Sequence, residues 1–192
     1  LALSPVSPLT ATIALTFYIA LFLAMPVILY QIWAFVAPGL YRQEKRFTFP
    51  LLATSIMLFF VGMAFAYYVV FPLIFGFVST FTPDTVNYQP DMTEYVSFVM
   101  MVVLVFGLAF ETPIATVLLV MTGLTTTQKL GKARPYVFLG AFVIGMLLTP
   151  PDVISQTMLA VPVYLLYELG ILMSRVVSRK EKEPAEGPEV TP

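Results

Sequence analysis

The residues best suited to chemistry in this chain are a few carboxylates, and the most unusual of them is Glu111. It lies inside the apolar segment 106–113, where a carboxyl group is costly unless it is neutral, hydrogen-bonded or near water. Pro113 has no N–H for the carbonyl one turn earlier, so we expect a kink and an inward-facing polar notch beside the acid. Ionisable groups inside membranes are functional by default. The structural alternative is a neutral carboxyl satisfied by Thr112, Thr116 or a neighbouring helix.

Two further acids have to be weighed against simpler roles. Glu44 is the only acid in the basic segment 40–46, where local charge balance at a solvated helix end is the simpler reading and a functional one needs a cationic ligand. Glu168 lies near the end of the last apolar stretch, within reach of interfacial water or of the basic residues beyond it. The sequence favours neither a structural nor a functional role for Glu168.

Several kinds of chemistry are excluded by the residues that the sequence lacks. There is no histidine and no cysteine, which removes thiol catalysis, disulfides and the commonest base and metal ligands. There is also no Gly-rich phosphate loop, Walker lysine or dinucleotide fingerprint. We therefore expect no enzyme activity, no metal or other cofactor, and no nucleic acid as a partner.

The elements that must position these acids are membrane helices. Hydrophobic residues make up 59% of the chain and charged residues 11%, and mean hydropathy is +0.89, far from the composition of soluble domains. A span needs about 20 apolar residues. The sequence predicts an all-α polytopic membrane protein in which residues 1–173 form the membrane domain, with helices at 12–37, 47–78, 94–121, 135–148 and 153–173.

The last two helices are separated by a short turn. Pro150 and Pro151 stop the first of them, and Asp152 is placed to cap the second. The fourth helix, with about 14 residues and a length of about 21 Å, is shorter than a bilayer core, so we expect local thinning there.

The basic residues indicate the topology. All ten lie in three segments that five crossings bring to one face: Arg42, Lys45, Arg46, Lys129, Lys132, Arg134, Arg175, Arg179, Lys180 and Lys182. The other face carries Asp84, Asp91, Glu94 and Asp152. The positive-inside rule places the basic face, and with it the carboxyl terminus, in the cytoplasm. An odd number of crossings then leaves the start outside, so we expect a sixth helix before Leu1. Residues 174–192 are predicted to form a disordered polar tail.

Taken together, the polar residues, glycines and prolines that interrupt these apolar helices resemble those of the TatC family, the large membrane subunit of the twin-arginine protein translocase. They lie at Pro26 to Arg46, Gly62 to Pro72, Phe106 to Pro113, and Arg134 to Thr157. The resemblance covers residues 7–175. It implies six kinked helices in a curved, glove-like arrangement, with both termini in the cytoplasm, in the plasma (inner) membrane of a prokaryote.

The resemblance also implies a function. The family is a receptor and scaffold that binds twin-arginine signal peptides and assembles with TatA/TatB-type single-span subunits, and with further copies of itself, to export folded proteins using the proton-motive force. Glu44 matches the acid that recognises signal-peptide arginines. The resemblance therefore favours a binding role for Glu44 over local charge balance. Glu111 matches the polar residue inside the membrane that is suited to contact a partner helix, and Gln156 is a second candidate for that contact. The alternative is a proton-coupled small-solute transporter that uses Glu111.

Overall fold

The computed structural model describes four stretches of the chain: residues 7–36, 48–81, 91–149 and 153–182. Within these stretches the elements are helical, and five helices are long and apolar enough to cross a membrane. This confirms the predicted all-α architecture with five crossings. The first crossing is α1 (Ser7–Val36), and the last two are α6 (Thr127–Leu148) and α7 (Val153–Lys182).

The second and third crossings are interrupted helices. The second consists of α2 (Thr48–Phe65), the π-helical turn η3 (Ala66–Val70) and α3 (Phe71–Phe81). The third consists of α4 (Met92–Ala109) and α5 (Thr112–Met121). Each interruption changes which side of the crossing faces its neighbours, because an extra or missing residue per turn rotates everything beyond it.

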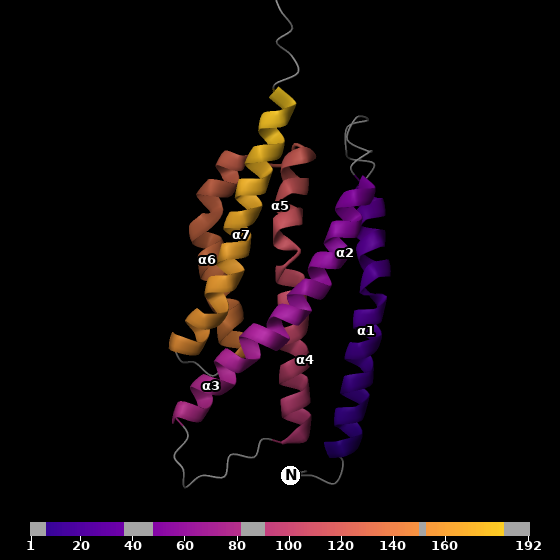
Figure 1. The fold of residues 1–192 in the computed structure, drawn as a ribbon, viewed down its shortest axis with the longest axis vertical. Coiled ribbons are helices and arrows are strands. Elements are labelled where there is room, and N and C mark those ends of the chain that lie inside the picture. The colour runs from indigo at the N-terminus through magenta and orange to yellow at the C-terminus, as the bar shows by residue number, and fades with distance from the viewer. Residues whose placement is uncertain (1–6, 37–47, 82–90, 150–152, 183–192) are drawn as a thin grey trace, which may run out of the picture.

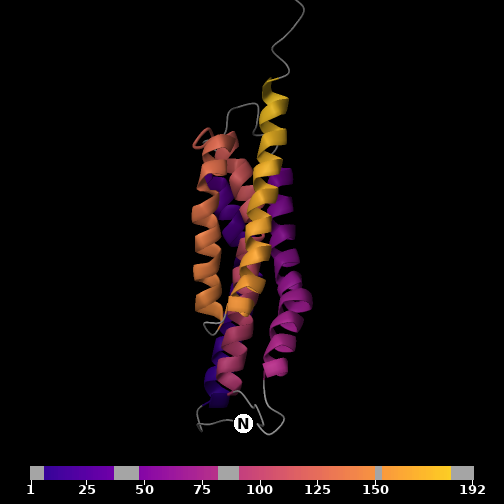
Figure 2. The same ribbon diagram turned by 90° about the vertical axis from the view of Figure 1, so that its left-hand side faces the viewer.

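The crossings are packed in two groups that share the third one. α4 packs against α1 and α2, whereas its continuation α5 packs against α7, which also packs against α6 (Figure 1). The segment from α2 to α3 runs obliquely across the molecule, so that α3 approaches α7 (Figure 1). The assembly is broad in Figure 1 and much thinner when turned by 90° (Figure 2). The junction of α4 and α5 therefore lies where the two groups meet.

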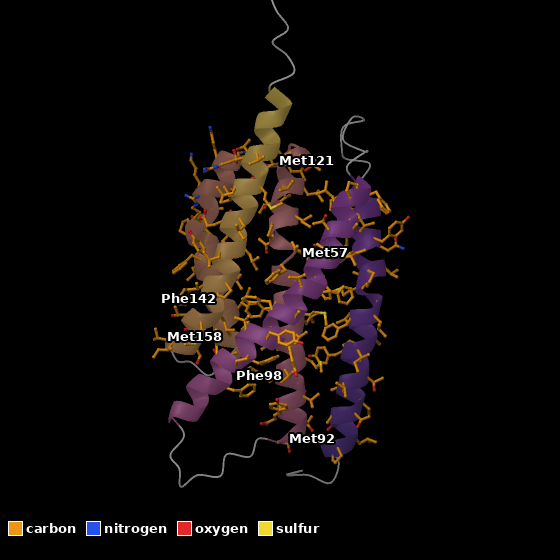
Figure 3. The ribbon with its side chains drawn as sticks, in the orientation of Figure 1. Met57, Met92, Phe98, Met121, Phe142 and Met158 are labelled. Carbon is orange, nitrogen blue, oxygen red and sulfur yellow. The ribbon has the colours of Figure 1, made fainter. Side chains whose placement is uncertain are left out.

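The main hydrophobic core lies in the first group. Its fully buried side chains include Phe59 of α2, and Val102 and Phe106 of α4. Many large apolar side chains elsewhere are exposed on the outer surfaces of the helices, where sticks project away from the ribbon (Figure 3). An apolar exterior is what a bilayer requires of a membrane protein.

The described helix ends separate the charges. Lys129, Lys132 and Arg134 lie at the start of α6, and Arg175 lies near the end of α7, at one end of the molecule (Figure 1). We call this the basic end; α1 ends there and α2 begins there (Figure 1). At the opposite end Asp91 caps α4 by accepting a hydrogen bond of 2.7 Å from the backbone N–H of Thr93.

The fourth crossing is longer than the sequence predicts. The predicted helix 135–148 begins in the structure at Thr127, because the Thr126 side chain caps it by accepting from the Lys129 N–H. Pro135 lies inside α6, and water can serve the single carbonyl that a proline leaves unpaired near a helix end. The expected length of about 14 residues is thus wrong. The lower ends of α6 and α7 nevertheless stop short of those of α3 and α4 (Figure 1), and membrane thinning stays a prediction.

The fifth crossing is also longer than predicted. The polar tail was placed from residue 174, but α7 continues to Lys182. Ser174 is fully buried, and its hydroxyl donates to the Ile171 carbonyl at 2.8 Å. A polar side chain that hydrogen-bonds to its own helix does not end that helix. The predicted start of the tail at residue 174 is therefore wrong. Residues 183–192 lie outside the described part of the chain.

Candidate functional site: a buried carboxyl at the α4–α5 junction

The interruption expected beside Pro113 is present, and Glu111 occupies it. α4 ends at Ala109 and α5 begins at Thr112. The Phe110 N–H still reaches back four residues to Phe106 at 3.0 Å, whereas the Glu111 N–H reaches back only three, to Leu108 at 3.1 Å. This tightening, followed by a proline without an N–H, interrupts the helix at the position of the acid.

The carboxyl group of Glu111 is hydrogen-bonded at one oxygen and not at the other. Its Oε2 accepts a hydrogen bond from the hydroxyl of Ser55 on α2, and Ser55 is fully buried. Its Oε1 is buried and has no hydrogen-bond partner. A buried oxygen without a donor is costly, so the carboxyl is only half satisfied by its own chain.

The structural alternative for Glu111 is a carboxyl satisfied by Thr112, Thr116 or a neighbouring helix, and the structure tests it directly. The Thr116 hydroxyl donates to the Pro113 carbonyl at 2.8 Å rather than to the acid. The partner from a neighbouring helix is Ser55, which the sequence analysis did not single out. The available signal was weak: Thr54 and Ser55 form a pair of hydroxyl residues in an apolar run, and nothing in the sequence shows which of them faces α4.

Close helix packing holds Ser55 opposite the acid. A Cβ added to Gly62 of α2 would lie 2.6 Å from the carbonyl oxygen of Phe106, 2.9 Å from the Cβ of Phe110 and 3.0 Å from the Cα of Gly107. A Cβ added to Gly107 would lie 2.6 Å from the ring of Phe59. Glycine thus lets the α2 and α4 backbones touch, as small residues do in membrane helix pairs.

A second close approach fixes the other side of the junction. A Cβ on Gly170 of α7 would lie 2.2 Å from the Oγ1 of Thr116 and 2.9 Å from the Cα of Pro113. The first residues of α5 are therefore pressed onto α7 just after the interruption. Glu111 lies between two contacts that leave no room for a methyl group.

The second predicted intramembrane polar residue, Gln156, is bound within the α6–α7 hairpin. Its side-chain N–H₂ donates to the Phe142 carbonyl at 3.0 Å. A Cβ on Gly145 would lie 3.1 Å from the Cγ of Gln156, so the two helices are close here as well. The structure does not bring Gln156 together with Glu111 in a single cluster, because the two residues lie on different helices with different partners.

Glu168 has an intramolecular partner that the sequence analysis did not identify. The Arg134 Nε lies 2.7 Å from its Oε1, and one terminal guanidinium nitrogen donates to its Oε2 at 2.8 Å. The Tyr164 hydroxyl donates to Oε1 at 3.0 Å. The sequence contains a signal for this pair. Arg134 and Glu168 are separated from Pro151 by the same number of residues, so an antiparallel hairpin that turns there places them side by side. These bonds support a structural role for Glu168.

The remaining predicted residues lie outside the described part of the chain: Glu44, Pro150, Pro151 and Asp152. Among the residues that are described, no three acidic, histidine or cysteine side chains gather in a way that could hold a metal ion.

Comparison with known proteins gives a consistent picture. The family model described as "Sec-independent protein translocase protein (TatC)" matches residues 1–162. A TatC of Azotobacter chroococcum is 51% identical over 95% of this chain and 72% of its own length. The TatC of Escherichia coli K12 is 55% identical over 88% of this chain and 66% of its own length. The chain thus spans about two thirds to three quarters of these relatives.

A solved structure agrees with these relatives in fold. A crystal structure described as "Twin Arginine Translocase Receptor- TatC" superimposes with a TM-score of 0.84 and is 40% identical, over 93% of this chain and 79% of that one. A second crystal structure of the receptor, in the detergent DDM, gives a TM-score of 0.82 at 40% identity, over 91% of this chain and 78% of that one. None of these relatives supports the alternative of a small-solute transporter. On sequence and fold together, the chain belongs to the TatC family.

Proposed function

We propose that this protein is the core receptor and scaffold of a twin-arginine translocase. It binds twin-arginine signal peptides at its basic end and assembles with TatA/TatB-type single-span subunits to export folded proteins with the proton-motive force. The observation that carries this proposal is the agreement in fold with the TatC receptor, a TM-score of 0.84 at 40% identity.

The charge distribution supports an orientation for this receptor. The described basic residues of α6 and α7 share one end of the molecule, and the caps and acids of α4 lie at the other. By the positive-inside rule the basic end, including the carboxyl terminus, faces the cytoplasm. Signal peptides would then be received there, in the inner membrane of a prokaryote.

Glu44 is the proposed recognition residue. It lies in the sequence between the end of α1 and the start of α2, both at the basic end. A carboxylate accepts two parallel hydrogen bonds from a guanidinium, which is a rigid fork of donors, whereas a lysine offers a single point charge. Arginine selectivity follows from that difference in geometry.

The test is photocrosslinking from a residue next to Glu44 to a twin-arginine peptide in membranes, with a twin-lysine peptide as the control. We expect Glu44→Ala and Glu44→Gln to weaken crosslinking alike, because both remove the charge and Gln keeps the size. Equal crosslinking of the two peptides to the unmodified protein, or unchanged crosslinking in Glu44→Gln at low salt, would contradict the assignment.

Glu111 is the proposed contact for a partner helix. Its half-satisfied carboxyl is suited to a polar group on a single-span subunit, and such interhelical bonds are worth about 1 kcal/mol in membranes. Gln156 is a second proposed contact; because one of its two N–H donors is engaged with the Phe142 carbonyl, a partner would meet its amide oxygen or its second N–H. Self-association of the scaffold completes the proposed assembly.

A further inference from the structure

We propose that Ser55 is a positioning residue for the partner contact at Glu111: its hydroxyl holds one carboxyl oxygen in place and leaves the other as the oxygen that still needs a hydrogen-bond donor. The donor class is a polar side chain on a membrane helix of a partner subunit. The inference deepens the proposed function and rests on the role proposed there for Glu111.

The first observation is the asymmetry of the two oxygens. Ser55 and Glu111 are 56 positions apart in the sequence, and their hydrogen bond joins α2 to the interruption between α4 and α5. Ser55 has no exposed surface, so no solvent competes for its hydroxyl. Oε1 is buried without a partner, so it is the oxygen of this carboxyl group that still lacks a hydrogen-bond donor.

The second observation is that the backbone around this pair is fixed. Gly62 sits against Phe106 and Gly107 on one side, and Gly170 sits against Pro113 on the other. With both helices held, the remaining freedom of the acid is rotation about its own side-chain bonds. A glutamate has several such rotations to lose, and the Ser55 bond removes them before a partner arrives.

A merely structural role for Ser55 is the competing explanation. In that case the hydroxyl would tie α2 to α4, and its loss would lower stability without any specific effect on the carboxyl group or on partner binding. The chain offers a matched control in the adjacent residue. Thr54 is exposed, and its hydroxyl donates only within its own helix, to the Pro50 carbonyl at 2.8 Å.

The experiment compares Ser55→Ala, Ser55→Thr and Thr54→Ala in the full-length protein in membranes with its single-span subunits. Infrared spectroscopy follows the Glu111 carboxyl band, identified by its absence in Glu111→Ala. Cysteine crosslinking between α4 and the partner helix measures the contact. We expect Ser55→Ala to shift the band and to weaken crosslinking about fivefold, the equivalent of one interhelical hydrogen bond. Ser55→Thr should restore both, and Thr54→Ala should change neither.

The possible results separate this inference from the proposed function. If Glu111→Ala abolishes crosslinking but Ser55→Ala behaves like Thr54→Ala, the positioning role is wrong and the partner contact stands. If Glu111→Ala crosslinks like the unmodified protein, the proposed contact itself fails and the role of Ser55 fails with it. A band that does not move in Ser55→Ala also overturns the inference, whatever the crosslinking shows.

Discussion

A single methyl group added at Gly62 should separate the two helices that carry Ser55 and Glu111. In Gly62→Ala the new carbon would lie 2.6 Å from the Phe106 carbonyl oxygen, 2.9 Å from the Phe110 Cβ and 3.0 Å from the Gly107 Cα. Ordinary contacts of this kind begin near 3.4 Å. None of these three atoms is the end of a flexible side chain, so only a shift of α2 away from α4 can accommodate the methyl group.

The cost follows from two opposing effects. Overpacking a close contact typically costs about 1–3 kcal/mol, and replacing a helical glycine by alanine returns roughly 0.5–1 kcal/mol. The net loss lies between about 0 and 2.5 kcal/mol, and a loss of about 1–2 kcal/mol would reduce the ratio of folded to unfolded protein by about 5- to 30-fold. Gly140→Ala is the matched control, because a Cβ there meets nothing within 4 Å and keeps only the favourable effect.

The measurement is reversible unfolding in mixed micelles, with the two alanine variants compared at equal protein concentration. We expect the variants to differ by about 1–3 kcal/mol in free energy of unfolding, since the propensity gain is common to both and the overpacking cost is not. The Glu111 carboxyl band should also shift in Gly62→Ala as α2 withdraws Ser55. If Gly62→Ala unfolds at the same detergent fraction as Gly140→Ala, the close approach of α2 and α4 is wrong.

Two smaller effects can be measured by the same unfolding experiment. Arg134→Lys keeps the charge beside Glu168 but loses the guanidinium fork; because the Arg134 side chain is 41% exposed, we expect a loss below about 1 kcal/mol, and a loss as large as that of Gly62→Ala would contradict this. Gln156→Leu removes the donor to the Phe142 carbonyl and should cost about 1 kcal/mol; a variant as stable as the unmodified protein would show that this bond contributes nothing to the hairpin.

Much of the fold can be predicted from the sequence because lipid imposes simple rules. Runs of about 20 apolar residues span the core, and these rules identified five crossings. They fail at helix ends, where polar residues belong to the helix rather than to a loop. Thr126 caps α6 well before Pro135, and Ser174 continues α7 by bonding to Ile171. A rule that ends a helix at a proline or at the first polar residue therefore misplaces both boundaries.

The candidate site could be predicted only in part. The cost of a buried acid and the missing N–H of Pro113 are local properties, and they identified Glu111 and the helix interruption beside it. The partners are not local. Ser55 is one of two adjacent hydroxyl residues, and the one that faces Glu111 depends on the rotation of α2. The π-helical turn Ala66–Val70 shows that such a rotation is not constant along the crossing, so a periodicity fitted to the whole predicted helix 47–78 could not have chosen between them.

Glu111 differs from Glu168 and Gln156 in how completely the chain satisfies it. Glu168 is held by Arg134 and Tyr164, and Gln156 bonds to the backbone of α6. Within the described ranges, the Oε1 of Glu111 is the buried carboxyl oxygen that has no hydrogen-bond partner. A bilayer offers no water to satisfy it, and the packing at Gly62 and Gly170 leaves no freedom to bury it elsewhere. A donor from outside the chain resolves the cost most directly, and in a translocase scaffold that donor would be a partner helix.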